Sequence, residues 1–173
     1  MADAPDGIVL ERHRDLQGAH GPWARRVLLG AIALVSVLGL LNVFGQRPDT
    51  KTAAVPAAKL SLRAPSHLRG GLLFSARFTI DAQQGLKRAR LVLDPGWAEE
   101  MAINTIEPSP TEEASDDGKL SFELGPIAAG KTFVLYMQFQ VNPTNVGRRS
   151  QDVSLFDGQT HLLTLSRDVT IYP

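Results

Sequence analysis

The first clear pattern along this chain is a long apolar run. From Val27 to Phe44 there are eighteen residues without a charge. As a helix at 1.5 Å per residue this run spans roughly 27 Å, close to the hydrocarbon thickness of a bilayer. A buried helix of a soluble domain normally keeps a polar face, whereas this run is interrupted by little more than Ser36 and Asn42. The pattern therefore predicts a transmembrane helix at 27–44.

After residue 58 the hydrophobic period changes to two, which is the period of half-buried β-strands. The two clearest alternating runs are 72–81 and 133–141. Weaker runs predict further strands at 59–63, 86–93, 102–106, 119–124, 152–156, 160–165 and 168–172. Turn-forming residues such as Asp94-Pro95-Gly96 and Asp157-Gly158 separate them. Short strands with frequent turns predict a mainly β fold, an antiparallel β-sandwich.

These patterns divide the chain into four segments. Residues 1–26 form a polar tail, 27–44 the helix, 45–58 a linker rich in Pro, Thr and Ala, and 59–173 the β-domain. The basic residues within about 20 positions of the helix number four on each side, so the positive-inside rule leaves the orientation open. Arg25 and Arg26 abut the helix, and we therefore expect a cytoplasmic N-terminus and an extracytoplasmic domain in the cell membrane.

A cleaved export signal is the alternative interpretation of the apolar run. Arg25-Arg26 and the apolar residues after them resemble a weak twin-arginine motif. The run is longer than the ~7 to 15 residues of a usual signal core, and the nearest promising small-residue site, at 55–58, lies far beyond Phe44. An uncleaved anchor is favoured over a secreted domain.

The segment Leu120–Gly147 resembles a pattern in bacterial immunoglobulin-like domains of the conserved-repeat and CARDB type. In those domains a strand ends in a Leu-Gly turn closed by a second Gly, here Leu124–Gly130, and a long alternating strand follows, here Lys131–Val141. The resemblance covers roughly residues 59–173. It implies an immunoglobulin-like β-sandwich outside the cytoplasm that serves adhesion, spacing or docking to other envelope proteins.

Composition narrows the function. Lys plus Arg and Asp plus Glu number 18 each, so no net basic field is available for nucleic acid. The absence of cysteine excludes disulfides, thiolate metal sites and a cysteine nucleophile. The four His lack metal-ligand spacing, and neither a serine nucleophile elbow nor a Gly-rich phosphate loop is present. We therefore expect no enzyme activity and no catalytic, cofactor or metal site. The acidic segment 112–118 lacks the ligand order of an EF-hand, so a solvated hairpin connection is favoured there over Ca²⁺ binding.

Two loops are candidate interaction sites. Trp97 and Met101 are of the types enriched in binding hot spots, although Trp97 is favoured as a plug at one end of the sandwich. In the second loop, Asn142 is followed by Arg148 and Arg149, which suit a carboxylate or phosphate partner. A solvated loop is the favoured alternative there.

The apolar helix carries a third candidate site. Small or polar side chains near one side of a membrane helix permit close approach of a second helix. We expect the helix to associate with itself or with another membrane protein. The residues concerned are Ala33, Ser36, Gly39 and Asn42.

Together these features predict a membrane-anchored accessory protein without enzyme activity, whose β-sandwich docks onto another membrane or envelope protein. A carbohydrate- or cell-wall-binding module is the alternative. Sugar sites need exposed aromatic rings, and the obvious candidates are Trp97, Tyr136 and Tyr172.

Overall fold

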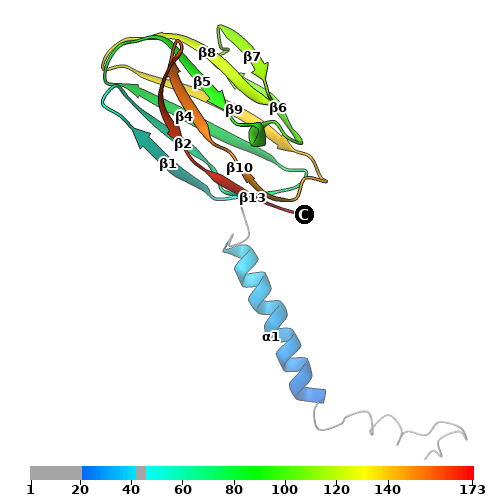
Figure 1. The fold of residues 1–173 in the computed structure, drawn as a ribbon. Coiled ribbons are helices and arrows are strands. Elements are labelled where there is room, and N and C mark those ends of the chain that lie inside the picture. The colour runs from blue at the N-terminus through cyan, green and yellow to red at the C-terminus, as the bar shows by residue number, and fades with distance from the viewer. Residues whose placement is uncertain (1–20, 42–45) are drawn as a thin grey trace, which may run out of the picture. The chain divides into compact units, whose positions relative to one another are not determined.

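The computed structural model describes residues 21–41 and 46–173 (Figure 1). The chain divides between Gly45 and Gln46 into two compact units. The first unit contains helix α1 (Gly21–Leu40), which begins before the predicted start at Val27. Pro22 is tolerated there because the first turn of a helix leaves its N–H groups unbonded in any case. The last predicted helical residues, 42–44, lie outside the described residues.

Helix α1 has the length and composition of a membrane span. Among residues 21–41 and 46–173, the stretch Pro22–Leu40 is the one helix long and apolar enough to cross a bilayer. Its large apolar side chains other than Leu38 are exposed, from 50% at Val27 to 87% at Leu40. A signal sequence near the N-terminus has the same properties, so this helix fits either an anchor or an export signal.

The second unit is an immunoglobulin-like β-sandwich, which confirms the predicted fold class (Figure 1). One five-stranded sheet has the order β1-β2-β4-β9-β6. These strands are β1 (Pro48–Ala54), β2 (Ala58–Pro65), β4 (Leu73–Ala82), β9 (Thr132–Val141) and β6 (Met101–Glu107). The facing sheet has the order β12-β11-β5-β8-β7. Its strands are β12 (Thr160–Leu165), β11 (Val153–Asp157), β5 (Leu86–Leu93), β8 (Lys119–Ile127) and β7 (Glu112–Asp116).

A small third sheet joins β10 (Gly147–Ser150), β13 (Asp168–Tyr172) and β3 (His67–Arg69). Within the described domain the β13–β3 pair is parallel and every other pair is antiparallel. This small sheet brings the end of the chain beside the segment that follows β2.

Alternation along β4 and β9 builds the centre of the core. Phe78 lies opposite Leu135, and Phe74 opposite Phe139, all on the buried face. The period-two run predicted at 72–81 would place Leu72 on the same face as Phe74. Leu72 is instead 48% exposed, because β4 begins one residue later and Leu72 belongs to the preceding turn.

Four short strands were not predicted, and one of them corrects a domain boundary. The predicted linker 45–58 contains β1, which pairs with β2 from Pro48↔Pro65 to Ala54↔Lys59. The linker assignment is therefore wrong for these residues, and the sandwich begins at Pro48. Strand β1 has no large aliphatic side chain, so its place in the sheet depends on backbone pairing with β2. The acidic segment 112–118 contains the exposed edge strand β7, and the predicted loop 142–149 ends in β10.

Candidate functional site

The structure overturns the prediction that Trp97 and Met101 lie on an interaction surface. Their side chains are 0% and 8% exposed. A short 3-10 helix, η2 (Pro95–Trp97), turns the chain inward, and the Trp97 ring lies 5.5 Å from that of Phe78 and 5.2 Å from that of Phe139. Trp97 is a buried core residue; the sequence favoured a plug at one end of the sandwich over an interface residue.

The predicted arginine pair is already bound by carboxylates of the same chain. Arg149 donates to Glu99 at 2.7 Å and to Glu100 at 3.1 Å, and its Nε donates to Asn145 Oδ1 at 2.9 Å. Arg148 donates to Asp168 at 2.7 Å. The Arg149 bonds tie β10 to the loop after η2, and the Arg148 bond ties β10 to β13.

Asn142, the third residue predicted in this loop, is exposed, and its backbone N–H donates to the Glu100 carbonyl. The polar anchor of the loop is Asn145, which sequence reasoning missed. Asn145 is fully buried, and its Nδ2 donates to the carbonyl oxygens of Glu99 and Glu100 at 3.3 Å. Asn142 is accessible to a partner, and its role in binding stays a prediction.

The helix residues remain candidates for association. Within α1, Ser36 Oγ donates to the Ile32 carbonyl at 2.9 Å, so its hydroxyl is satisfied inside its own helix. A Cβ added at Gly39 would meet no atom within 4 Å. Asn42 lies outside the described residues, and Ala33 is exposed on α1.

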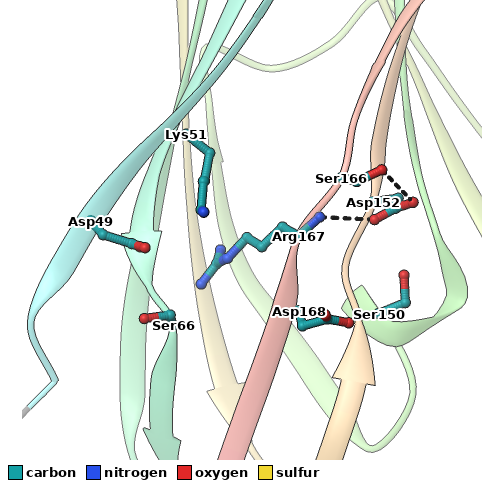
Figure 2. Close-up of a pocket in the computed structure, with 8 residues that line it drawn as sticks. All are labelled: Asp49, Lys51, Ser66, Ser150, Asp152, Ser166, Arg167 and Asp168. Atoms are coloured by element: carbon teal, nitrogen blue, oxygen red, sulfur yellow. Dashed lines mark hydrogen bonds between the residues drawn. The ribbon is translucent and has the colours of Figure 1, made fainter.

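Sequence reasoning also missed a polar cleft of about 520 Å³ in the sandwich, between β1 and the link from β12 to β13 (Figure 2). Its lining combines two cations, three carboxylates and three hydroxyl groups. The residues are Asp49, Lys51, Ser66, Ser150, Asp152, Ser166, Arg167 and Asp168.

Asp152 organises the β12–β13 link that forms one wall of the cleft. Its carboxylate accepts a hydrogen bond from the Arg167 backbone N–H at 2.9 Å and another from Ser166 Oγ at 3.1 Å. The Gln151 N–H donates to the Arg167 carbonyl at 2.7 Å. These three bonds fix the backbone from which the Arg167 side chain projects.

Arg167 is buried and incompletely hydrogen-bonded. It is 4% exposed, and its guanidinium carbon lies 5.5 Å from the centre of the Trp97 ring. Nη2 donates to the Pro65 carbonyl, whereas Nε and Nη1 have no hydrogen-bond partner among the described residues. Burial lowers the pKa of Arg167 to about 10, against the opposing effect of the Asp49 charge. The group is therefore still a cation at neutral pH.

The outer face of the β1-β2-β4-β9-β6 sheet carries a second concentration of positive charge. Arg63 of β2 lies directly opposite Arg77 of β4, and Arg77 lies opposite Tyr136 of β9. The Arg77 guanidinium carbon is 5.5 Å from the centre of the Tyr136 ring, which is 48% exposed. Neither arginine forms an ion pair with a carboxylate in the part of the chain that the structure describes.

On the facing sheet, by contrast, an arginine is paired with a carboxylate of the same sheet. Arg88 donates two hydrogen bonds of 2.9 Å to the Glu123 carboxylate. This contact raises the pKa of Arg88 and lowers that of Glu123. The acidic β7 strand lies at the edge of this sheet, and no group of three or more His, Asp or Glu side chains suited to a metal ion occurs in the described ranges.

The fold and these features define an immunoglobulin-like β-sandwich that follows an apolar helix long enough to cross a membrane. No family model and no curated protein matches the sequence.

Solved structures resemble the chain at low identity. The CARDB domain of a Pyrococcus furiosus protein is 12% identical, with 73% of this chain and 96% of that one covered and a TM-score of 0.39. The C-terminal domain of wzt is 14% identical, with 75% of this chain and 81% of that one covered and a TM-score of 0.44. A FixG-related protein from Vibrio parahaemolyticus is 11% identical, with 68% of this chain and 98% of that one covered and a TM-score of 0.39. The CARDB domain is of the type that the sequence resembles, but likeness at TM-scores of 0.39 to 0.44 carries no information about the family or the ligand of this chain.

Proposed function

We propose that this chain is a membrane-anchored, non-enzymatic interaction protein whose sandwich, outside the cytoplasm, docks onto an acidic surface of another membrane or envelope protein. Helix α1 supplies the anchor in the lipid bilayer. The observation that supports docking is the Arg63–Arg77 pair on the outer sheet face.

Two like charges directly opposite each other on neighbouring strands destabilise a sheet, by roughly 0.2–1 kcal/mol. Adjacent strands lie only about 4.8 Å apart, and no described carboxylate neutralises the two guanidinium groups. A carboxylate patch on a partner would relieve this repulsion and would gain bidentate hydrogen bonds. Tyr136 beside the pair adds an exposed aromatic ring, a residue type enriched at interfaces.

Site-specific crosslinking in cells tests this docking face. A photoreactive phenylalanine analogue at Tyr136 of the full-length chain should give a discrete protein adduct in the membrane fraction. The double substitution Arg63→Glu with Arg77→Glu should remove that adduct. A matched control is Lys87→Glu with Lys119→Glu, which reverses two exposed charges on the other sheet and should leave the adduct intact.

Two results would contradict the proposal. One is an adduct that survives reversal of both arginines, and the other is crosslinking to lipid without a protein adduct. The first would move the docking face elsewhere, and the second would replace the protein partner by the bilayer surface.

The wall-binding alternative retains two exposed tyrosines, Tyr136 and Tyr172, each 48% exposed. His67 stacks on Tyr172 with 6.0 Å between the ring centres. Retention of the full-length chain on isolated peptidoglycan, lost in a Tyr136→Ala, Tyr172→Ala variant, would favour this alternative. N-terminal sequencing of the chain from cells separates an uncleaved anchor from a cleaved signal.

A further inference from the structure

The cleft around Arg167 is separate from the outer sheet face, because its lining comes from β1, the segment after β2, and the strands β10 and β13 with the links before β11 and β13. We infer that this cleft binds the carboxylate group of a ligand, with Arg167 as the principal contact.

The first argument is the burial of Arg167 without full compensation. A buried cation is costly unless it is paired and hydrogen-bonded. Arg167 is 4% exposed and lacks a carboxylate within ion-pairing distance among the described residues, and two of its nitrogen atoms lack acceptors. A ligand carboxylate in the cleft beside Arg167 supplies the missing charge.

The second argument is the charge that remains after the internal contacts are counted. Both oxygens of Asp152 already accept hydrogen bonds, and Asp168 is paired with Arg148. The donors to Asp152 are neutral, so its negative charge remains. Arg167 and Lys51 are therefore balanced by Asp49 and Asp152, and a lining without net positive charge suits a monoanion better than a phosphate dianion.

The third argument is the geometry of the wall. Figure 2 shows the Arg167 guanidinium directed toward Asp49, Lys51 and Ser66, on the side away from Asp152 and Asp168. The Trp97 ring supports the planar guanidinium from within the core. A planar fork of N–H donors suits the two oxygens of a carboxylate. The volume of about 520 Å³ lies within the range of small-ligand clefts.

A carboxylate comes from two sources, a polypeptide C-terminus or an acidic side chain, and synthetic peptides distinguish them. The full-length chain in detergent would carry Trp23→Phe, so that Trp97 is the remaining tryptophan and its emission reports on Arg167. It would be titrated with acetyl-Ala-Ala-Ala bearing a free C-terminus, with amidated acetyl-Ala-Asp-Ala, with amidated acetyl-Ala-Ala-Ala, and with inorganic phosphate. We expect a saturable change with one or both of the carboxylate peptides and none with the neutral amide.

Variants test whether the response comes from the cleft. Arg167→Met should abolish it, and Lys51→Gln, at an exposed position, should weaken it in a chain that still folds. Asp49→Asn removes the competing carboxylate and should tighten binding by about two- to fivefold. A purely structural role for Arg167 predicts no such gain. Glu113→Gln on the edge strand β7 is the control and should bind as the parent does.

Three results would overturn the inference. They are the absence of a saturable change with both carboxylate peptides, an equal change with the neutral amide or with phosphate alone, and weaker binding in Asp49→Asn. Because the docking test depends on Arg63 and Arg77, either proposal can fail while the other stands.

Discussion

Replacement of Trp97 by alanine tests both the core and the discarded interface interpretation. Trp97 is fully buried and packs between Phe78 and Phe139, which are also fully buried. If Trp97 were an interface residue, its loss would weaken partner binding and leave the fold unchanged. If the structure is right, its loss removes the centre of the core.

The size of the effect follows from these contacts. Truncation of a buried Phe or Trp to Ala costs about 3–5 kcal/mol through lost transfer energy and the cavity left behind. That figure already includes the two aromatic pairs, at about 0.5–1.5 kcal/mol each, and the ring beneath the Arg167 guanidinium. Since Arg167 would lose its support as well, we expect a loss of about 4 kcal/mol, a large share of the ~5–15 kcal/mol typical of a domain.

Urea unfolding of the full-length chain in detergent, followed by the β-sheet circular dichroism signal, measures this loss. Trp97→Phe, which keeps an aromatic ring, should cost about half as much. Trp23→Ala is the matched control, because Trp23 lies on α1 and is 69% exposed, and it should leave the transition of the sandwich unchanged. A loss below about 1 kcal/mol for Trp97→Ala would refute the core assignment.

Three further predictions concern other elements. Gly96→Ala should lower the free energy of unfolding, measured in urea, by about 3 kcal/mol or more, because a Cβ there overlaps the Ser150 carbonyl of β10. Gly85→Ala is the control and should cost far less, since the nearest atom to its added Cβ would lie at an ordinary 3.7 Å. Equal costs would contradict the close approach of Gly96 to β10. The hydrogen bonds from Arg88 hold the pKa of Glu123 below its ordinary 4.5, so their contribution to the free energy of unfolding is present above pH 4.5 and lost as the pH falls through the lower pKa of the folded state. Glu123→Gln should therefore flatten the acid limb of the stability curve measured against pH, and an unchanged limb would sink this assignment. Gly39→Leu should abolish a crosslinked dimer formed through α1, whereas Gly30→Leu, half a helical circumference away at 100° per residue, should not; equal dimer yields would argue against association through that face.

Strands in which apolar and polar side chains alternate were predictable from the sequence. Strands that are held only by backbone hydrogen bonds to a neighbouring strand were not. Strands β4 and β9 bury every second side chain, so their apolar residues recur with period two. Strand β7, with the sequence Glu-Glu-Ala-Ser-Asp, is exposed at every position and has no such pattern. An edge strand of this kind resembles a polar loop in sequence, although its charges protect the sheet edge from another chain.

The candidate site was harder to predict because its members meet across long sequence distances. Arg167 donates to the carbonyl of Pro65 and covers Trp97, and Asp49 approaches from the first strand. In sequence, Ser166-Arg167-Asp168 is an ordinary polar junction between two strands. Conversely, the adjacent Arg148 and Arg149 suggested a binding pair, and the structure pairs both with carboxylates of this chain.

Three of the arginine environments in the sandwich differ in how much of the guanidinium group is left without a charge or hydrogen-bond partner. Arg88 and Arg149 are held by carboxylates of the domain, so replacing them should act on stability. Arg63 and Arg77 face solvent beside a like charge, where repulsion is weak and screened by salt. Arg167 combines burial with two unused nitrogen donors, a local cost that a stable fold avoids unless function requires it. For that reason the proposed carboxylate site lies at the link between β12 and β13, which no sequence motif marks.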